Sequence, residues 1–169
     1  GHEEIEPALV KLYRVTGEER YLKLSKFFVD ERGRKPHYFD REIEALGQTT
    51  GGAHWSDRTH NYNQAHLPVR EQTTAEGHSV RACYLYAGMA DVAAETGDAE
   101  LLRACKAIWD NIETRRMYVH GGIGSSRFGE RFTFDYDLPN EEAYAETCAA
   151  IALVFFARRM LDIEPHRRY

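Results

Sequence analysis

Apolar side chains recur every three to four positions in four segments of the chain, which places them on one face of an α-helix. The first segment spans residues 3–15 and the second spans residues 19–31. Thr16-Gly17-Glu18 separates them, and Gly17 suits the left-handed position that commonly ends a helix. The pattern therefore predicts two helices joined by a short turn. Their expected buried side chains are Ile5, Ala8, Leu9, Leu12 and Tyr13 in the first and Tyr21, Leu22, Leu24, Phe27 and Phe28 in the second.

The same arrangement recurs further along the chain. A third segment begins with the capping box Thr73-x-x-Glu76, and a fourth spans about residues 100–115. Thr96-Gly97-Asp98 lies between them, in the place that Thr16-Gly17-Glu18 has in the first pair. Two hairpins with matching turns are typical of a helical-hairpin array or of a closed α/α barrel. The predicted fold class is all-α.

Two long segments lack this periodicity. Residues 34–71 contain Trp55 and a dense polar and aromatic run at 58–66, and residues 117–140 contain the glycine-rich stretch 121–124. Long segments of this kind in compact domains are usually functional or disordered, and these are too rich in aromatic residues for disorder. Solenoid binding modules keep short turns, so the two loops favour a barrel that carries a site.

Composition narrows the class of protein. The chain has 169 residues, 43% of them hydrophobic, which suffices for one domain with a core. A net charge of −5 offers no basic surface for nucleic acid, and no apolar run approaches the roughly 18 residues of a membrane span. Three separated cysteines do not form a disulfide framework, and no signal peptide is visible, so a cytoplasmic location is expected.

The richest chemistry lies in residues 129–148, just before the uncharged apolar run 149–157. This stretch combines carboxylates, aromatic rings that suit sugars, and a Glu-x-Cys pair. Carboxylates next to a buried element are costly unless they are paired, hydrogen-bonded or bound to a metal. The combination predicts a working site at the rim of the core.

Glu146 and Cys148 supply two ligand types that zinc accepts, a carboxylate and a thiolate. Within one helix they would lie about 200° apart and could not share a metal. They can converge if Thr147 is at a helix start, where it would cap a helix from Cys148 to about Leu161. The alternative is a buried cysteine beside an incidental glutamate.

Glu130 lies in a loop among Phe128, Phe132 and Phe134. An apolar setting raises the pKa of a carboxyl group, which suits a general acid. A solvated loop glutamate, or one paired with a neighbouring arginine, remains the alternative.

His78 follows Gly77 in the first turn of the third helix, where the helix dipole disfavours a charged imidazole. A neutral histidine there could hydrogen-bond sugar hydroxyls, or it could serve as a capping or core residue. His60 and His66 are candidates of similar quality.

Several motifs together, in this order, resemble the β-L-arabinofuranosidase family of glycoside hydrolases (family 127, formerly a domain family of unknown function). They are Tyr62-Asn63-Gln64-Ala65-His66-Leu67-Pro68-Val69-Arg70-Glu71, Glu76-Gly77-His78-Ser79-Val80-Arg81, Tyr118-Val119-x-Gly121-Gly122-Ile123-Gly124, Leu138-Pro139-Asn140 and Ala143-Tyr144-Ala145-Glu146-Thr147-Cys148. The match covers essentially the whole chain. The combination is specific, although each piece alone is weak.

The resemblance implies that the chain is part of an (α/α)6 barrel. It also implies a zinc-dependent retaining hydrolase that removes terminal β-L-arabinofuranose from plant-type glycans, with an arabinose-containing oligosaccharide as its partner. Members of the family use a zinc-bound cysteine as nucleophile, where most retaining glycosidases use a second carboxylate. By position in the motifs, Glu130 resembles the general acid/base, and Glu146 and Cys148 resemble two of the zinc ligands. The residues that we expect to bind substrate are His2, His66, His78 and Tyr144.

One part of the family pattern is missing. The nucleophilic cysteine belongs to a cysteine-rich segment further along the family's chain, and Cys83 and Cys105 are not substitutes. The chain also begins at Gly1 without an initiator methionine. We therefore expect residues 1–169 to be a partial catalytic barrel, incomplete at both ends and inactive alone, within a longer protein, the parent protein, expected to be a homodimer. The alternatives are another α/α-barrel carbohydrate enzyme, either a two-carboxylate hydrolase or a lyase, and a helical-repeat binding module.

Overall fold

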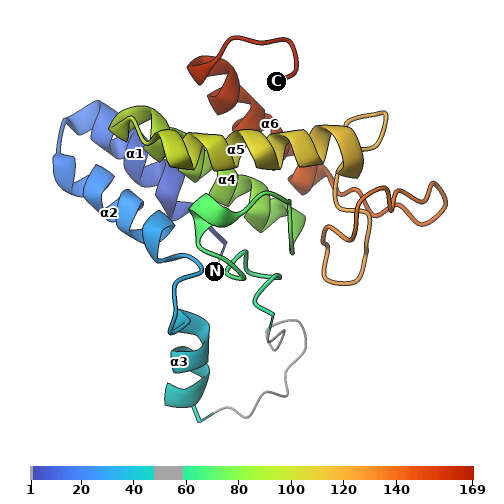
Figure 1. Ribbon diagram of the computed structural model, residues 1–169, viewed down its shortest axis with the longest axis horizontal. Helices are drawn as coiled ribbons and strands as arrows, with labels where there is room; N and C mark the ends of the chain where they lie inside the picture. Colours follow the sequence, from blue (N-terminus) through green and yellow to red (C-terminus); the bar gives the residue numbers. More distant parts are fainter. Residues whose placement is uncertain (1, 48–58) are drawn as a thin grey trace.

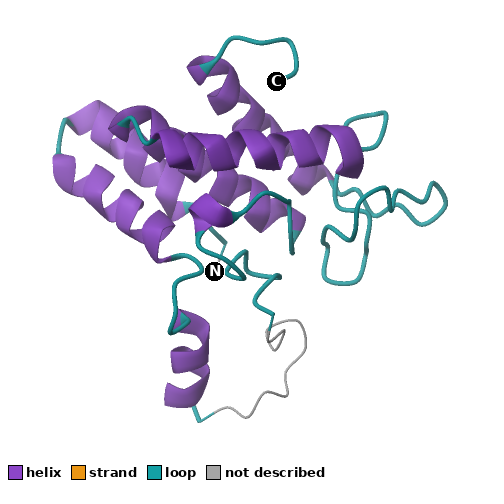
Figure 2. Cartoon of the chain, viewed as in Figure 1, coloured by secondary structure: helices purple, strands orange, loops and turns teal. Residues whose placement is uncertain are grey.

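The regular elements of the chain are helices and short helical turns, in a computed structural model that describes residues 2–47 and 59–169. Figure 2 shows that, in these two ranges, the helices are joined by loops and no strand is present. The all-α fold class is therefore confirmed. In chain order, the elements are α1 (Ile5–Thr16), α2 (Glu19–Glu31), α3 (Tyr38–Ala45), the 3₁₀ turn η1 (Val69–Glu71), α4 (Ser79–Thr96), α5 (Ala99–Asn111), the π turn η2 (Ile112–Arg116) and α6 (Thr147–Ile163).

The two predicted hairpins are present as α1–α2 and α4–α5 (Figure 1). Gly17 has φ 73° and Gly97 has φ 69°, so both occupy the left-handed conformation that the turns required. Each glycine N–H donates to a carbonyl of the preceding helix, at Tyr13 and Ala93 respectively. These turns follow from local sequence alone.

Helix α4 is the centre of the molecule, because it packs against α1, α2, α5 and α6. Small side chains let its neighbours approach closely. A Cβ atom at Gly88 would lie 2.8 Å from Cβ of Glu6, so a larger residue there would push α1 away. On α6, the buried ring of Phe156 packs at 5.7 Å from Tyr86 and 5.5 Å from Trp109, which joins α4, α5 and α6 into one core.

Two predictions about element boundaries were wrong. The Thr73-x-x-Glu76 box does not cap the third helix: α4 begins at Ser79, because His78 occupies the N-cap position instead. The segment 34–71 contains α3 and η1, although it was expected to be without regular structure. Helix α3 is only eight residues long and buries none of them. Trp55 lies outside the described residues.

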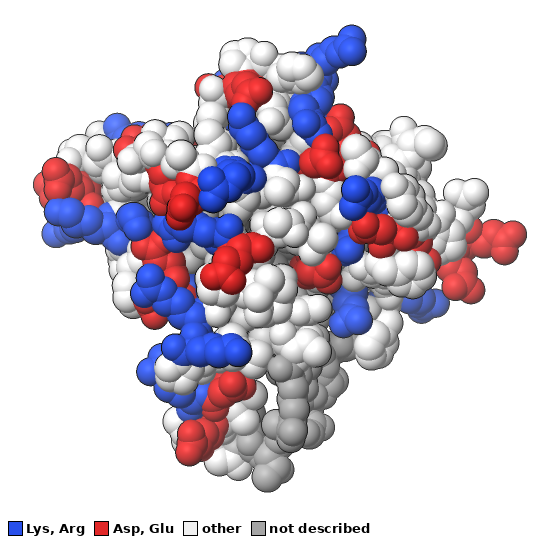
Figure 3. Space-filling view, in the orientation of Figure 1, with Lys and Arg blue, Asp and Glu red and all other residues white. Residues whose placement is uncertain are grey.

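The prediction of buried side chains was largely wrong for α1 and α2, where Leu9 alone of the ten named side chains is buried. The exposed fractions of Ile5, Leu24 and Phe27 are 49%, 43% and 55%. No element in the described ranges covers these side chains, and Val154 on α6 is similarly exposed at 63%. None of the helices in the described ranges is long and apolar enough to cross a membrane. Figure 3 shows basic and acidic side chains interspersed on the visible face.

Candidate active site

Two loops meet at the first turn of α4. Ser79 donates to the carbonyl of Glu130 twice, from its backbone N–H at 3.0 Å and from its hydroxyl at 2.9 Å. The N–H of Phe132 donates to the carbonyl of Gly77 at 3.0 Å. These bonds hold the loop of Glu130 against the helix start, so that Glu130 lies over His78.

The second loop brings Glu146 to the same place. The N–H groups of Tyr144 and Ala145 donate to the carbonyls of Ser125 and Gly124, at 3.1 and 3.0 Å. The side chains of Tyr144 and Glu146 therefore lie close to the carboxylate of Glu130. These backbone hydrogen bonds between the loops bring residues that are distant in sequence into one group.

The backbone is strained at both loops. Glu130 has φ 50° and Ala145 has φ 41°, values in the left-handed region that side chains other than glycine rarely adopt. Strained residues of this kind cluster at functional sites, where the surrounding structure holds them in place. The glycine before His78 is required for a different reason: a Cβ at Gly77 would lie 2.1 Å from the carbonyl oxygen of Asn61.

Glu130 is held by two hydrogen bonds. The hydroxyl of Tyr144 donates to Oε1 at 2.6 Å, and Nε2 of His78 lies 3.1 Å from Oε2. The Tyr144 bond, helped by His78 and opposed by partial burial, lowers the pKa of Glu130 below its ordinary value. The same bond raises the pKa of Tyr144 to about 12.

Of the alternatives that the sequence left open for Glu130, the apolar setting with a raised pKa is not the one found in this structure. Phe128 and Phe134 are 70% and 71% exposed, so they point away and do not enclose the carboxylate. Only Phe132 is buried. Polar contacts therefore dominate the electrostatics of Glu130, and the charged form is favoured in this structure.

His78 is neutral in this arrangement. Its Nδ1 accepts the backbone N–H of Arg81 at 3.4 Å, so the ring proton belongs on Nε2, which donates to Glu130. Burial lowers the pKa of His78, against the opposing influence of Glu130. The capping role considered from the sequence is present, and burial together with the hydrogen bond at Nδ1 favours the neutral ring.

Two further rings complete the polar group. His2 packs on His78 with their ring centroids 5.1 Å apart, and Tyr62 meets His78 edge-on at 5.7 Å. The structure thus brings together His2, His78, Glu130 and Tyr144 as the resemblance implied. Tyr62 was not predicted as a site residue, although it lies at the start of the first motif.

Glu146 is the N-cap residue of α6, with an extended backbone at φ −64° and ψ 150°. The expected cap, Thr147, is instead the first helical residue. Atoms of His78, Glu130 and Glu146 that could bind a metal all lie within 4.8 Å of one another. Oε1 of Glu146 is buried and has no hydrogen-bond partner, and burial followed by the charge of Glu130 raises the pKa of Glu146.

Cys148 is the second residue of α6, and its side chain is exposed. It does not belong to the group of His78, Glu130 and Glu146. Because the helix begins only at Thr147, Glu146 and Cys148 are not on opposite faces of one regular helix. A buried carboxylate oxygen without a hydrogen-bond partner and an exposed thiol two residues along the chain are ligand types that zinc accepts.

His66 is not brought into contact with this group by any hydrogen bond or ring contact in the described ranges. Burial lowers its pKa, and Glu76 is the charged group that opposes this. His60 lies elsewhere, with its ring 4.0 Å from that of His37 and its Nε2 3.3 Å from Asp40.

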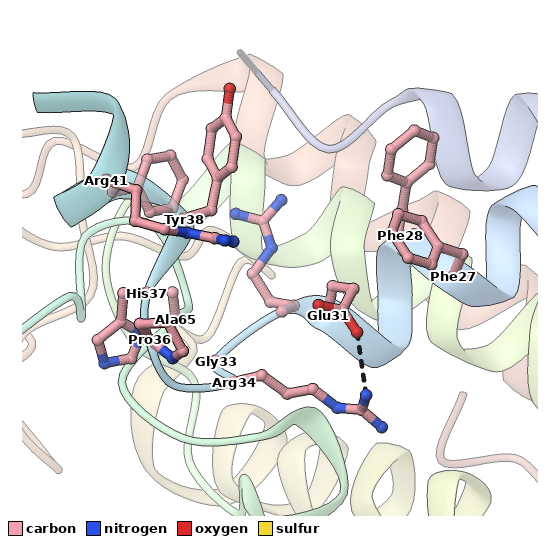
Figure 4. A pocket seen from close by; sticks show the side chains of 12 residues that line it. Phe27, Phe28, Glu31, Gly33, Arg34, Pro36, His37, Tyr38, Arg41 and Ala65 are labelled. Carbon is pink, nitrogen blue, oxygen red and sulfur yellow. Dashed lines mark hydrogen bonds and ion pairs between the residues drawn. The ribbon is translucent and has the colours of Figure 1, made fainter. Parts of the chain in front are cut away.

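A cavity of about 480 Å³ lies between the end of α2 and α3. Figure 4 shows Phe27, Phe28 and Glu31 on the side of α2, and Tyr38 and Arg41 on the side of α3. Neither Glu130 nor Glu146 lines this cavity. The candidate catalytic and metal-binding carboxylates therefore lie outside this cavity.

Comparison with known sequences agrees with the resemblance that the motifs indicated. A profile of the β-L-arabinofuranosidase GH127 catalytic domain matches residues 1–169. The chain is 48% identical over 169 residues to a non-reducing end β-L-arabinofuranosidase of Bifidobacterium longum subsp. longum. This alignment covers 100% of the chain and 26% of the relative, so the chain spans about a quarter of that enzyme's length.

Solved structures agree. The crystal structure of a GH127 β-L-arabinofuranosidase from Geobacillus stearothermophilus T6 superposes with a TM-score of 0.92 at 60% identity, covering 97% of the chain and 26% of that protein. A second GH127 β-arabinofuranosidase has a TM-score of 0.81 at 45% identity, covering 98% of the chain and 23% of that protein.

Proposed function

The chain belongs to the GH127 β-L-arabinofuranosidase family, and we propose that the parent protein is a retaining glycoside hydrolase that releases terminal β-L-arabinofuranose. The observation that carries this proposal is the carboxylate of Glu130, which is held between Tyr144 and His78 at the rim of the core. A glycosidase needs such a group to exchange a proton with the glycosidic oxygen.

Glu130 is the proposed general acid/base. In the free site its two hydrogen bonds favour the carboxylate, the form that accepts a proton from water in the second half of a retaining reaction. A sugar entering the site excludes water from a side chain that is 44% exposed, and desolvation raises the pKa toward the protonated form. The site can thus serve both halves of the reaction.

Histidines and tyrosine are proposed to orient the sugar. His2 and His78 present adjacent rings, and Tyr144 presents a hydroxyl, all at the carboxylate of Glu130. Donors and acceptors at fixed positions are what recognition of sugar hydroxyls requires. His66, whose buried Nδ1 has no hydrogen-bond partner among the described residues, remains a predicted substrate contact.

Glu146 and Cys148 would hold zinc, together with ligands from outside this chain. When bound, zinc keeps coordinated thiols deprotonated. The orphaned Oε1 of Glu146 supports the assignment of Glu146 to the metal. Both oxygens of Glu130 are already hydrogen-bonded, which supports its separate role in proton transfer.

One observation favours a second candidate, a metal-free hydrolase with two carboxylates. Oxygens of Glu130 and Glu146 lie within 4.8 Å of each other, close to the separation of roughly 5 Å at which retaining glycosidases place their acid and nucleophile. In that enzyme Cys148 would have no chemical role.

Elemental analysis of the purified parent protein separates the two candidates. We expect one zinc per chain in the wild type, substantially less zinc in Cys148→Ser, and wild-type zinc in Glu130→Gln. Both variants should lose hydrolysis of β-L-arabinofuranosides, with Glu130→Gln reduced on the order of 10²–10⁴-fold. A wild-type enzyme without zinc, and an active Cys148→Ser variant, would contradict the zinc assignment and favour the two-carboxylate enzyme.

A further inference from the structure

Glu3 is a buried carboxylate that follows His2 and lies two residues before the start of α1. Its side chain is 0% exposed and lies between two guanidinium groups. Nη1 of Arg32 is 3.1 Å from Oε1, and Nε of Arg81 is 3.4 Å from Oε2. The side chain therefore joins the segment before α1 to the ends of α2 and of α4.

This ionic group is poorly suited to a purely stabilising role. Burial raises the pKa of Glu3, against the opposing charges of Arg32 and Arg81, and neither carboxylate oxygen accepts a hydrogen bond from the described residues. Buried ion pairs without well-formed hydrogen bonds often contribute less than apolar residues of similar size. A better explanation of such an ion pair is that it fixes the relative position of the segments that it joins.

The arrangement that Glu3 specifies is the contact between the two histidines. Arg81 is in the same turn of α4 as His78, and its backbone N–H donates to His78 Nδ1. Its guanidinium lies 5.7 Å from the ring of Tyr62, which itself packs on His78. Arg81 and His78 are thus fixed to one helix, whereas His2 precedes α1 and has no helix of its own.

We propose that Glu3 is a positioning residue that holds His2 against His78 by anchoring the segment before α1 to Arg81. Breaking the ion pair frees the backbone that carries His2, and the ring contact at 5.1 Å is lost while His78 and Glu130 stay in place. The consequence for substrate rests on the function proposed above, whereas the placement of the ring does not.

Activity of the parent protein tests the link through a double-mutant cycle. We expect Glu3→Gln to lower kcat/KM for a β-L-arabinofuranoside about 10-fold, chiefly by raising KM, and Glu3→Asp to recover part of the loss. In a His2→Ala background, Glu3→Gln should cost less than about 2-fold, because its target is already absent. An equal loss in both backgrounds would overturn the proposal.

Asp91→Asn is the matched control, since Asp91 is also buried between two arginines but lies in the second half of α4, away from His78. It should change kcat/KM by less than about 2-fold. If Glu3→Gln does not fold, Glu3→Asp takes its place in the cycle, and a loss that persists unchanged in the His2→Ala background again overturns the link.

Carbethoxylation of histidines, followed by mass spectrometry of the peptides, provides a readout without activity. Glu3→Gln should increase the modification rate of His78 severalfold, because its ring loses the cover of His2, whereas Asp91→Asn should leave that rate unchanged. If the modification rate of His78 increases in this way but the parent protein hydrolyses no arabinofuranoside, the positioning role is supported and the proposed function is rejected. An unchanged rate in a folded Glu3→Gln variant would overturn the positioning role.

Discussion

Two buried carboxylates, Asp91 and Glu3, each lie between two arginines, yet their surroundings differ. Asp91 is in the second half of α4, where Arg14 of α1 approaches Oδ1 at 3.2 Å and Arg159 of α6 donates to Oδ2 at 2.5 Å. Glu3 accepts no hydrogen bond from the described residues, and its partners approach it as charges. One carboxylate thus fastens three helices, while the other fastens the segment that carries His2.

The difference divides α4 into two functional halves. Its second half packs on α1 and α6 and is cross-linked by Asp91. Its first turn carries His78 and receives the loop of Glu130. Asp91 accepts an aligned hydrogen bond from Arg159, whereas Glu146 at the site keeps one buried oxygen without a hydrogen-bond partner, a condition under which a ligand can still gain by binding.

The largest expected effect comes from breaking the structural pair. Asp91→Asn in the parent protein should lower the free energy of unfolding by about 3 kcal/mol, because Arg14 and Arg159 lose the buried carboxylate with which both are paired. Urea unfolding of the purified variant measures this. Asp162→Asn, which removes an exposed pair with Arg158 on α6, is the control and should cost less than about 0.5 kcal/mol. Equal losses in the two variants would erase the contrast between the regions.

A smaller effect is expected on the site side. Tyr144→Phe removes the hydrogen bond to Glu130 and should lower kcat/KM about 10-fold, while urea unfolding stays within error of the wild type. Tyr136→Phe is the control, since Tyr136 is 71% exposed. The comparison fails if Tyr144→Phe is fully active, or if its activity falls only in step with its stability.

The smallest expected effect measures how much aligned hydrogen-bond donors contribute to the free energy of unfolding. Asp98 caps α5, accepting the N–H of Leu101 at 2.9 Å and two hydrogen bonds from Arg70 at 2.6 and 3.1 Å. Burial alone would raise the pKa of Asp98, but the bonds from Arg70 and Leu101 outweigh it and lower the pKa below the ordinary 3.8.

Asp98→Ala should therefore lower the free energy of unfolding by about 1 kcal/mol at neutral pH. Because the folded-state pKa is depressed, this contribution is fully present above pH 3.8 and is lost as the pH falls through the folded value. Urea unfolding between pH 3 and pH 7 should show the difference shrinking only at the acid end. A difference independent of pH would assign the effect to helix propensity instead.

The hairpins and the nature of the site residues could be predicted from the sequence, because they depend on neighbours along the chain. Apolar spacing and the left-handed glycines Gly17 and Gly97 are local signals, and α1, α2 and α5 formed close to where these signals predicted them. His78 was identified within one of the motifs, and Glu130 from its place in the loop between two of them. One available signal was missed: Arg81 interrupts the apolar face of α4, and a charge at such a position indicates a buried partner.

Only the tertiary structure decided the electrostatics. Whether Phe128 covers Glu130 or points into solvent depends on how the loop folds back on α4, and that orientation set the direction in which the pKa moved. The pairing of Glu3 with Arg81 joins residues 78 positions apart, which no periodicity encodes. Local propensity determines where helices begin and end, whereas the pKa of a group and the contacts it can make depend on through-space neighbours, and these exist only once the chain has folded.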